Sequence, residues 1–159
     1  MFNAKNHKQL NMFDPWDYLG PKRRKELDKS WAGLFRHNIL KTLPVDKLRK
    51  HYDSSNGRPS KELYSLLGLM VLQQMHDLTD EQAVEQYSYN IKYHYALDIT
   101  GFSDEHSYVS LRTIWKMRKL LTQENFHEVL FRKINKKLAK VFKVNICAIC
   151  GESGFFVKQ

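Results

Sequence analysis

The chain has 159 residues, of which 42% are hydrophobic and 13% aromatic, enough to bury one ordinary core. Its 26 Lys and Arg outnumber 17 Asp and Glu, which gives a formal net charge of +9. The longest apolar run, near Leu66–Leu72, is too short to span a bilayer, and the first ten residues lack the apolar core of a secretion signal. We therefore expect a globular, cytoplasmic protein without a membrane-spanning segment.

Residues 1–29 are rich in aromatic and charged side chains but show no clear periodicity, and they end in the basic cluster Lys22–Lys25. This pattern predicts an irregular, flexible arm. A helical domain is expected from 30 to 143, followed by a short tail from 144 to 159. The tail holds both cysteines, Cys147 and Cys150.

The first predicted helix begins at Ser30, a good N-cap, and runs to Pro44. A short helix is expected over Val45–Tyr52. The next seven residues, Asp53–Pro59, contain Asn-Gly and Pro and are the strongest loop signal in the chain.

From Ser60 onward, apolar residues recur at helical spacing as far as Met75 and predict a buried helix. The sequence Thr79-Asp-Glu-Gln82 has the form of a capping box, so a second helix should begin there and bury Ala83, Val84 and Tyr87. Spacing alone allows either a helix-turn-helix or a simple hairpin of two helices. Only residues 93–99 have strand-like composition, and no sheet is evident.

Two basic helices are predicted near the end of the domain. Between Arg112 and Lys143 lie ten Lys or Arg and only two acids, a net charge of +8. The first helix, from about Glu105 to Leu121, carries three cations on one face at i, i+4 and i+7, and its apolar spacing assigns Trp115 to the core. The second, from about Thr122 to Phe142, carries a cationic row opposite an apolar face. The rows are Arg112, Lys116 and Lys119 on the first helix and Arg132, Lys136, Lys140 and Lys143 on the second.

The sequence thus predicts an all-α helical bundle with a helix-turn-helix-like element, an irregular N-terminal arm and basic C-terminal helices. A surface dominated by one sign of charge favours contact with a phosphate backbone over a merely solvated helix face. The stretch Asp77–Glu105 has seven acids and one base, so another face should avoid phosphate. Arg58 and Lys61 flank a helix start that also suits phosphate, although simple exposure explains them equally well.

Other chemistries have weaker support. His94, Asp98, Asp104 and His106 could form a metal or acid–base site, but no third ligand has a clear spacing, and helix capping better explains Ser103 or Asp104. The Cys-x-x-Cys pair lacks a second Cys/His pair for zinc. The tyrosines between Tyr87 and Tyr95 could stack on bases, yet packing between helices is the preferred interpretation. No metal or cofactor is therefore expected.

Several segments resemble the N-terminal region of bacterial insertion-sequence transposases of the DDE class, over roughly Met1 to Asn145. The most specific are Gly57-Arg-Pro-Ser60, which leads into the buried helix, and Ser103-Asp-Glu-His-Ser-Tyr-Val-Ser-Leu-Arg112 before the basic helix. Further matching segments are Phe13-Asp-Pro-Trp-Asp-Tyr-Leu-Gly-Pro-Lys-Arg-Arg-Lys25, Ser30-Trp-Ala-Gly-Leu-Phe-Arg36, His94-Tyr-Ala-Leu-Asp-Ile99 and Leu138-Ala-Lys-Val-Phe142. The resemblance implies an all-helical domain that engages the double-stranded terminal repeats of a mobile element and precedes the catalytic domain.

In that family an RNase H-like domain performs the chemistry, with three carboxylates that hold two Mg²⁺. Here no Asp follows Asp104, and the sequence after Asn145 departs from the family pattern. We therefore expect a truncated or frame-shifted copy that binds DNA but is not an enzyme, with Mg²⁺ needed only by the missing domain. The alternative is an inhibitory fragment that forms oligomers, or pairs with intact transposase, through the apolar face of Phe126–Val141. A free-standing enzyme is the least favoured hypothesis, because no convergent catalytic group is evident.

Overall fold

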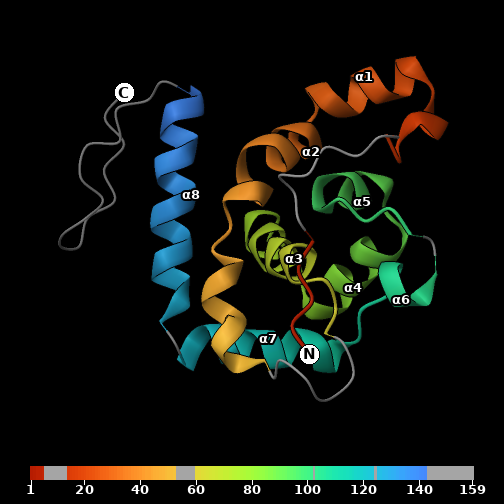
Figure 1. Cartoon of the computed structure of the whole chain (residues 1–159). Helices are drawn as coiled ribbons and strands as arrows, with labels where there is room; N and C mark the ends of the chain where they lie inside the picture. Colours follow the sequence, from red (N-terminus) through yellow and green to blue (C-terminus); the bar gives the residue numbers. More distant parts are fainter. Residues whose placement is uncertain (6–13, 53–59, 102, 124, 143–159) are drawn as a thin grey trace.

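A computed structural model describes residues 1–5, 14–52, 60–101, 103–123 and 125–142, and in these ranges every regular element is a helix, which confirms the all-α prediction (Figure 1). The α-helices are α1 Pro21–Lys29, α2 Trp31–Leu34, α3 Leu63–Met75, α4 Asp80–Tyr89, α5 Ile91–Leu97, α6 Asp104–Ser107, α7 Leu111–Gln123 and α8 Phe126–Phe142. Shorter helical turns are η1 Asp17–Leu19, η2 Phe35–Ile39, η3 Leu40–Thr42 and η4 Val45–His51.

The centre of the domain is α3, with α2 above it, α7 below it and α4 and α5 along one side (Figure 1). Its leucines Leu63, Leu67, Leu69 and Leu72 are fully buried. The Glu62 carboxylate caps the helix by accepting from the backbone N–H groups of Tyr64 and Ser65. Met75, expected in the core, is instead 55% exposed because the helix ends there.

The predicted helix from Ser30 is confirmed as helical chain up to Thr42, but its pitch changes along the way. It begins as α2, widens to a π-helix in η2 and tightens to a 3-10 helix in η3. The Ser30 hydroxyl accepts from the Ala32 N–H, as an N-cap should. Leu43 turns extended before Pro44, because the proline ring disfavours a helical conformation in the preceding residue. The short helix η4 follows where it was predicted.

The turn between α3 and α4 is tight, since Asp77 adopts a left-handed conformation with φ 50°. The predicted capping box is present in full. The Thr79 hydroxyl accepts from the Gln82 N–H, and the Gln82 side chain accepts from the Thr79 N–H. Ala83 and Tyr87 are buried as expected, whereas Val84 is only partly covered. The strand-like residues 93–99 fall mostly in α5, which Asn90 caps at its start.

The single helix predicted from Glu105 to Leu121 is wrong in one respect, since two helices, α6 and α7, occupy this stretch. Tyr108 is extended between them, which allows Val109 to enter the core. The hydroxyl and carbonyl of Ser110 then accept from the Thr113 N–H and start α7. Asn125, with φ 47°, separates α7 from α8 three residues later than the predicted boundary.

The N-terminal segment is also more ordered than predicted. From Asp14 onward it folds onto the domain, with η1 and α1 in place of an irregular arm. Trp16 is only 1% exposed, its ring packs edge-on against Tyr95, and its indole N–H donates to Asp98 at 3.5 Å. A composition without helical periodicity could not reveal this, because the anchoring partners lie about eighty residues further along the chain. Residues 6–13 lie outside the described ranges.

Candidate nucleic-acid interface

Helix α7 presents a row of cations to solvent. Its apolar residues Ile114, Met117 and Leu121 are buried against the domain, where α7 packs on α3 and α4. Arg112, Lys116 and Lys119 lie on the opposite side, and all three are exposed. Within the described residues none of the three has an acidic partner. The row predicted from sequence is therefore on the surface and available to a ligand.

Helix α8 carries the second predicted row. Phe126 and Leu130 are buried against the domain, which α8 contacts through α7 and η2. Arg132, Lys136 and Lys140 are exposed, and Arg132 forms an exposed ion pair with Glu128 at 3.7 Å. Lys143 lies outside the described residues. Ile134, Leu138 and Val141 are partly covered, and Phe131, which the sequence interpretation left aside, is 53% exposed.

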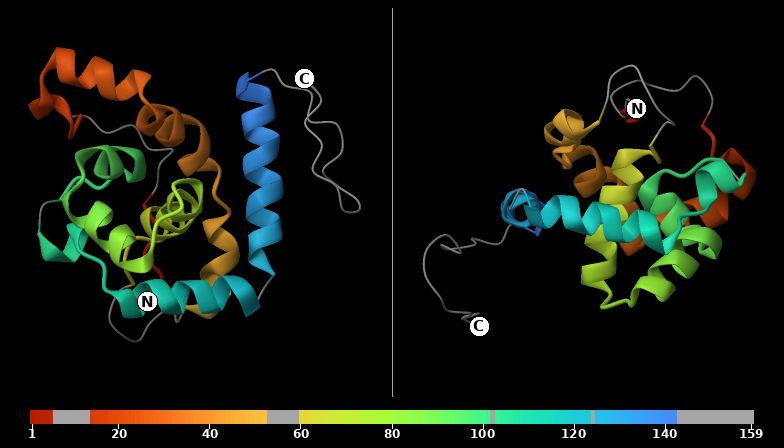
Figure 2. Two further views of the ribbon diagram at one scale, coloured as in Figure 1. Left: turned by 180° about the vertical axis from the view of Figure 1, so that it is seen from behind. Right: turned by 90° about the horizontal axis from the view of Figure 1, so that it is seen from below.

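The two rows do not form one straight line. Helices α7 and α8 are the two arms of an L along the lower and outer edges of the domain (Figure 1). Seen from below, α7 crosses the front of the domain and α8 is viewed along its axis (Figure 2). The left-handed Asn125 makes the corner. A ligand that touches both rows must therefore follow this bend or bind one arm at a time.

Arg118, the remaining cation of α7, has a structural role. Its guanidinium donates to both carboxylate oxygens of Asp80, with Nη1 3.0 Å from Oδ2, and to the Gln73 side chain at 3.3 Å. The indole N–H of Trp115 donates to the same Asp80 at 2.8 Å. The hydrogen bonds from Arg118 are the main reason that the pKa of Asp80 lies well below its ordinary value.

This contact corrects the prediction for Trp115. The side chain is 53% exposed and lies at the edge of the interface, whereas the sequence assigned it to the core. Apolar spacing suggested burial, but the indole nitrogen needs a polar partner and finds it at the first residue of α4. The sequence carries no local signal for this contact, because the two residues are 35 positions apart.

The other predicted pair of phosphate-binding candidates is Arg58 and Lys61. The Lys61 ammonium donates to the backbone carbonyls of Asp104, at 2.9 Å, and Glu105. This contact links the residues just before α3 to α6. Because its ammonium is already hydrogen-bonded, Lys61 is less able to bind phosphate than the cations of the α7 row. Arg58 lies outside the described residues.

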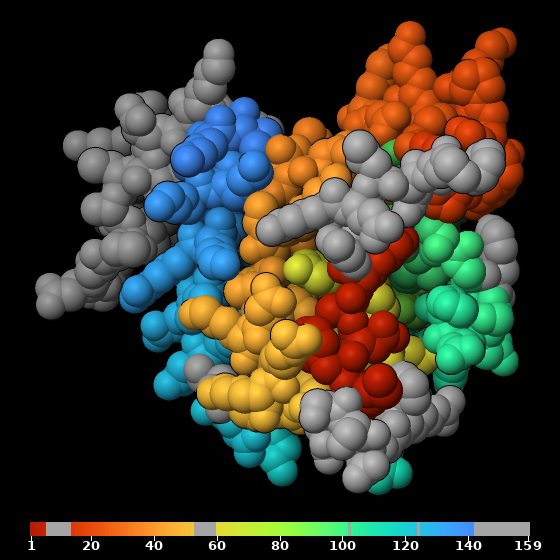
Figure 3. Space-filling model, in the orientation of Figure 1, coloured from red at the N-terminus to blue at the C-terminus, as the bar shows by residue number. Residues whose placement is uncertain are grey.

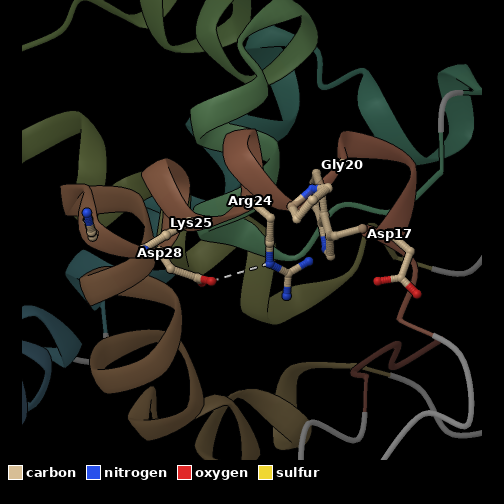
Figure 4. Close-up of a pocket in the computed structure, with 8 residues that line it drawn as sticks. Asp17, Gly20, Arg24, Lys25 and Asp28 are labelled. Carbon is tan, nitrogen blue, oxygen red and sulfur yellow. Dashed lines mark ion pairs between the residues drawn. The ribbon is translucent and has the colours of Figure 1, made fainter.

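A hollow of about 580 Å³ beside α1 also contains cations, but its charge is mixed (Figure 4). Arg24 points toward Asp28, with a separation of 3.6 Å, and also pairs with Asp14 at 2.8 Å. Burial opposes both ionised carboxylates, yet the pKa of Asp14 is lowered by the Trp16 backbone N–H and by Arg24. The pKa of Asp28 is lowered by the hydroxyl of Tyr95, by His37 and by Arg24. Because Arg24 is engaged and Asp17 also lines the hollow, the hollow itself is a poor anion site, although Lys25 and Lys29, which also line it, are exposed.

The residues considered for acid–base or metal chemistry have partners inside the domain. The His94 ring lies 2.7 Å from the Tyr87 carbonyl, and Asp98 pairs with Lys5 at 2.6 Å and Arg36 at 2.7 Å. Ser103 occupies the N-cap position of α6, where its hydroxyl meets the His106 ring. In the described part of the chain, no group of three His, Cys, Asp or Glu converges on a common point.

The tyrosines follow the packing interpretation with one exception. Tyr87, Tyr93 and Tyr95 are buried between helices, and burial raises the pKa of Tyr87 and of Tyr95 to about 12. Tyr89 is 85% exposed at the end of α4, contrary to the prediction. The remaining outward side chains of α4 include Glu81 and Glu85, and α4 has no Lys or Arg. Helix α4 therefore presents carboxylates where α7 presents cations.

Comparison with known proteins identifies one family. The profile described as a transposase domain, DUF772, matches residues 25–120, a range that spans α2 to α6 and most of α1 and α7. No curated protein and no solved structure matches the chain. Among the described residues, no helix is both long enough and apolar enough to span a bilayer.

Proposed function

This chain belongs to the DUF772 family of transposase domains, and from that premise we propose that it binds double-stranded DNA during transposition. The proposed contact surface is the outer face of α7, extended by the exposed cations of α8. The DNA partner is the terminal repeat of a mobile element. The proposal assigns this chain the DNA-binding step and no strand cleavage or transfer, and it requires no cofactor.

The observation that carries this proposal is the difference between the α7 row and three cations elsewhere on the domain or on the other side of α7. Arg24, Lys61 and Arg118 are held by oxygen atoms of the domain itself. Arg112, Lys116 and Lys119 have no such partner in the described residues, although they lie on a well-packed helix. Unneutralised cations held at fixed positions suit a ligand with regularly spaced negative charges.

The dimensions fit a DNA backbone. Seven residues of helix rise about 10 Å, so the row from Arg112 to Lys119 has about the length of three nucleotides of one strand. Contacts of this kind position a protein on DNA and make its affinity depend on salt.

We also propose α7, and not α4, as the helix that faces the DNA. The sequence does not decide which of the two helices would read a groove. In the structure α4 begins after the tight turn at Asp77, and α7 begins after the extended Tyr108. The exposed Glu81 and Glu85 of α4 would repel phosphate, whereas α7 presents three cations beside the half-exposed Trp115.

The test is a titration of the chain with duplex DNA across a salt series, using the element's terminal repeat and a scrambled duplex of equal length. The triple variant R112Q/K116Q/K119Q should lower the slope of log affinity against log salt by roughly 2 to 3, because each phosphate contact contributes about 0.9. The charge-preserving variant R112K/K116R/K119R is the matched control and should keep most of the slope.

An unchanged slope in the glutamine variant would remove α7 from the interface. Tighter binding to the repeat that persists as salt rises would support end recognition, and equal binding to both duplexes would limit the function to backbone contact. The alternative, association with another transposase copy through α8, draws on the exposed Phe131 and the partly exposed Ile134 and Leu138. Self-association without DNA binding at any salt would favour it.

A further inference from the structure

A second basic surface lies on α1, away from the α7–α8 interface. The inner side of α1 is formed by Arg24, Leu27 and Asp28, which pack on the domain or pair with one another. The outer side carries Lys22, Lys25 and Lys29 at i, i+3 and i+7. All three are exposed, and Arg23 is exposed on the flank. This repeats the arrangement of the α7 row on an unrelated helix.

The charges of this surface are largely uncompensated. Its acids are Glu26, which pairs with Lys29 at 3.7 Å across an exposed gap, and Asp17 at the foot of the helix. An exposed pair of this kind neutralises little. Asp14 and Asp28 are occupied by Arg24, and Asp28 also accepts from the Tyr95 hydroxyl. Lys22, Arg23 and Lys25 therefore have no acidic partner in the described parts of the chain.

A neighbouring helix adds to the same surface. Between α1 and the start of α5 lies an open hollow of about 550 Å³, where Lys92 of α5 joins Lys22, Arg23 and Lys29, with Glu26 as the one acid in the described lining. Lys92 is the single base within the acidic stretch 77–105, and it lies beside the cations of α1. Cations from two helices thus border one shallow, solvent-open hollow.

The α1 surface and the α7 row lie at opposite ends of the domain, with α3, α4 and α5 between them, in both side views (Figures 1 and 2). The space-filling view shows α1 standing out from the body at the corner away from α8 (Figure 3). One straight duplex that lies along α7 would therefore leave α1 free.

We propose that α1, together with Lys92, is a second site for duplex DNA, so that one copy of this domain bridges two DNA segments. The inference rests on the proposed function of α7 and adds a ligand to it. The row from Lys22 to Lys29 also rises about 10 Å, the length of about three nucleotides of one strand. A lipid surface fits less well, because the only leucine of α1 is buried and the helix has no exposed apolar face to insert.

The test uses the full chain and two short duplexes, one immobilised and one fluorescent and free. The wild-type chain should retain the free duplex on the immobilised one, and with excess duplex it should bind two duplexes per chain. The variant K22Q/R23Q/K25Q/K92Q should retain at least ten-fold less free duplex and bind one duplex per chain. The charge-preserving variant K22R/R23K/K25R/K92R should behave as wild type.

The outcomes separate this inference from the proposed function. One duplex per wild-type chain, or full retention by the glutamine variant, would overturn the second site while leaving α7 as an interface. Full retention would assign bridging to self-association, since that variant keeps both α7 and α8. If R112Q/K116Q/K119Q still binds two duplexes, the α7 proposal fails instead. Binding of an acidic peptide at α1 in preference to DNA would also overturn the second site.

Discussion

At the scale of single residues, Arg36, Arg118 and Arg112 differ in whether a carboxylate lies within reach of the guanidinium. Arg36 pairs with the largely covered Asp98 and stacks over the rings of Trp16 and Tyr95. Arg118 is bound to Asp80, and this raises its own pKa further above the ordinary value. Arg112 has no acidic partner among the residues that the structure describes. Charge counted along the sequence therefore overstates the charge that a partner meets.

One glycine is set by a close backbone approach, and it gives a testable prediction. A Cβ on Gly33 would lie 2.2 Å from the Asp28 carbonyl oxygen of α1, which cannot rotate away. Alanine normally stabilises a helical position by about 1 kcal/mol over glycine. Here we expect G33A to destabilise the domain by about 1–3 kcal/mol because of the clash, measured by urea unfolding.

Gly68 provides the matched control for this prediction. Its added Cβ would meet the Leu97 side chain at 2.6 Å, and a side chain can shift where a backbone carbonyl cannot. G68A should therefore cost less than G33A. If G33A were as stable as wild type, the close packing of α1 on α2 would be refuted.

At the scale of elements, one acidic residue at the start of α4 adds polar contacts to the apolar packing of α7. Replacing Asp80 with alanine should remove the hydrogen bonds from Arg118, Trp115 and Gln73 at once. We expect a loss of about 2 kcal/mol, the size typical of charged hydrogen bonds. This corresponds to a Tm about 4–8 °C lower for a chain of this length.

The neighbouring Glu81 gives the control, since it is exposed and shares the first turn of α4. E81A should cost only a few tenths of a kcal/mol through the helix dipole. Hydrogen exchange locates the effect, because amides of α7 should exchange faster in D80A. Equal exchange in both variants would mean that α7 is fixed by its apolar contacts alone.

Elements with local signals were predictable, and elements fixed by distant contacts were not. The Ser30 cap, the capping box at Thr79 and the buried face of α3 follow from short sequence patterns. The break at Tyr108 and the ordering of residues 14–29 depend on what those residues pack against in the folded domain.

The same distinction applies to the candidate site. The α7 and α8 rows were visible as charge at helical spacing, and the structure places them on the surface. The hydrogen bonds of Lys61 and Arg118 could not be predicted from the sequence, because their acceptors are 43 and 38 positions away along the chain. The basic face of α1 was noticed only as a cluster of charges, since no helix was predicted there.

At the scale of the whole molecule, three aspartates link stability to acid pH. Asp14, Asp28 and Asp80 all have pKa values below the ordinary 3.8 in the folded chain. The unfolded chain therefore binds more protons in acid, so the free energy of unfolding should fall as pH drops through about 4. Above about pH 5 this contribution should be constant.

Urea unfolding between pH 3 and 6 measures this dependence. In D80N the free energy of unfolding should depend less steeply on pH in the acid range, because residue 80 no longer titrates. In E81Q the dependence should stay nearly as steep as in wild type. A D80N profile as steep as that of wild type would show that Asp80 is not held in its charged form.

The partners of Asp98 determine where along the sequence the cooperatively folding region begins. The Asp98 carboxylate pairs with both Lys5 and Arg36 and accepts from the Trp16 indole N–H. The Asp98 backbone is left-handed and ends α5. Two of those three partners precede residue 25, where the family match starts. The region that the family profile matches is therefore shorter than the region that folds together. A version beginning at residue 25 would leave the Asp98 carboxylate without Lys5 and the Trp16 indole, with Arg36 still beside it, and would uncover the Tyr95 ring that Trp16 packs against, although every matched residue would still be present.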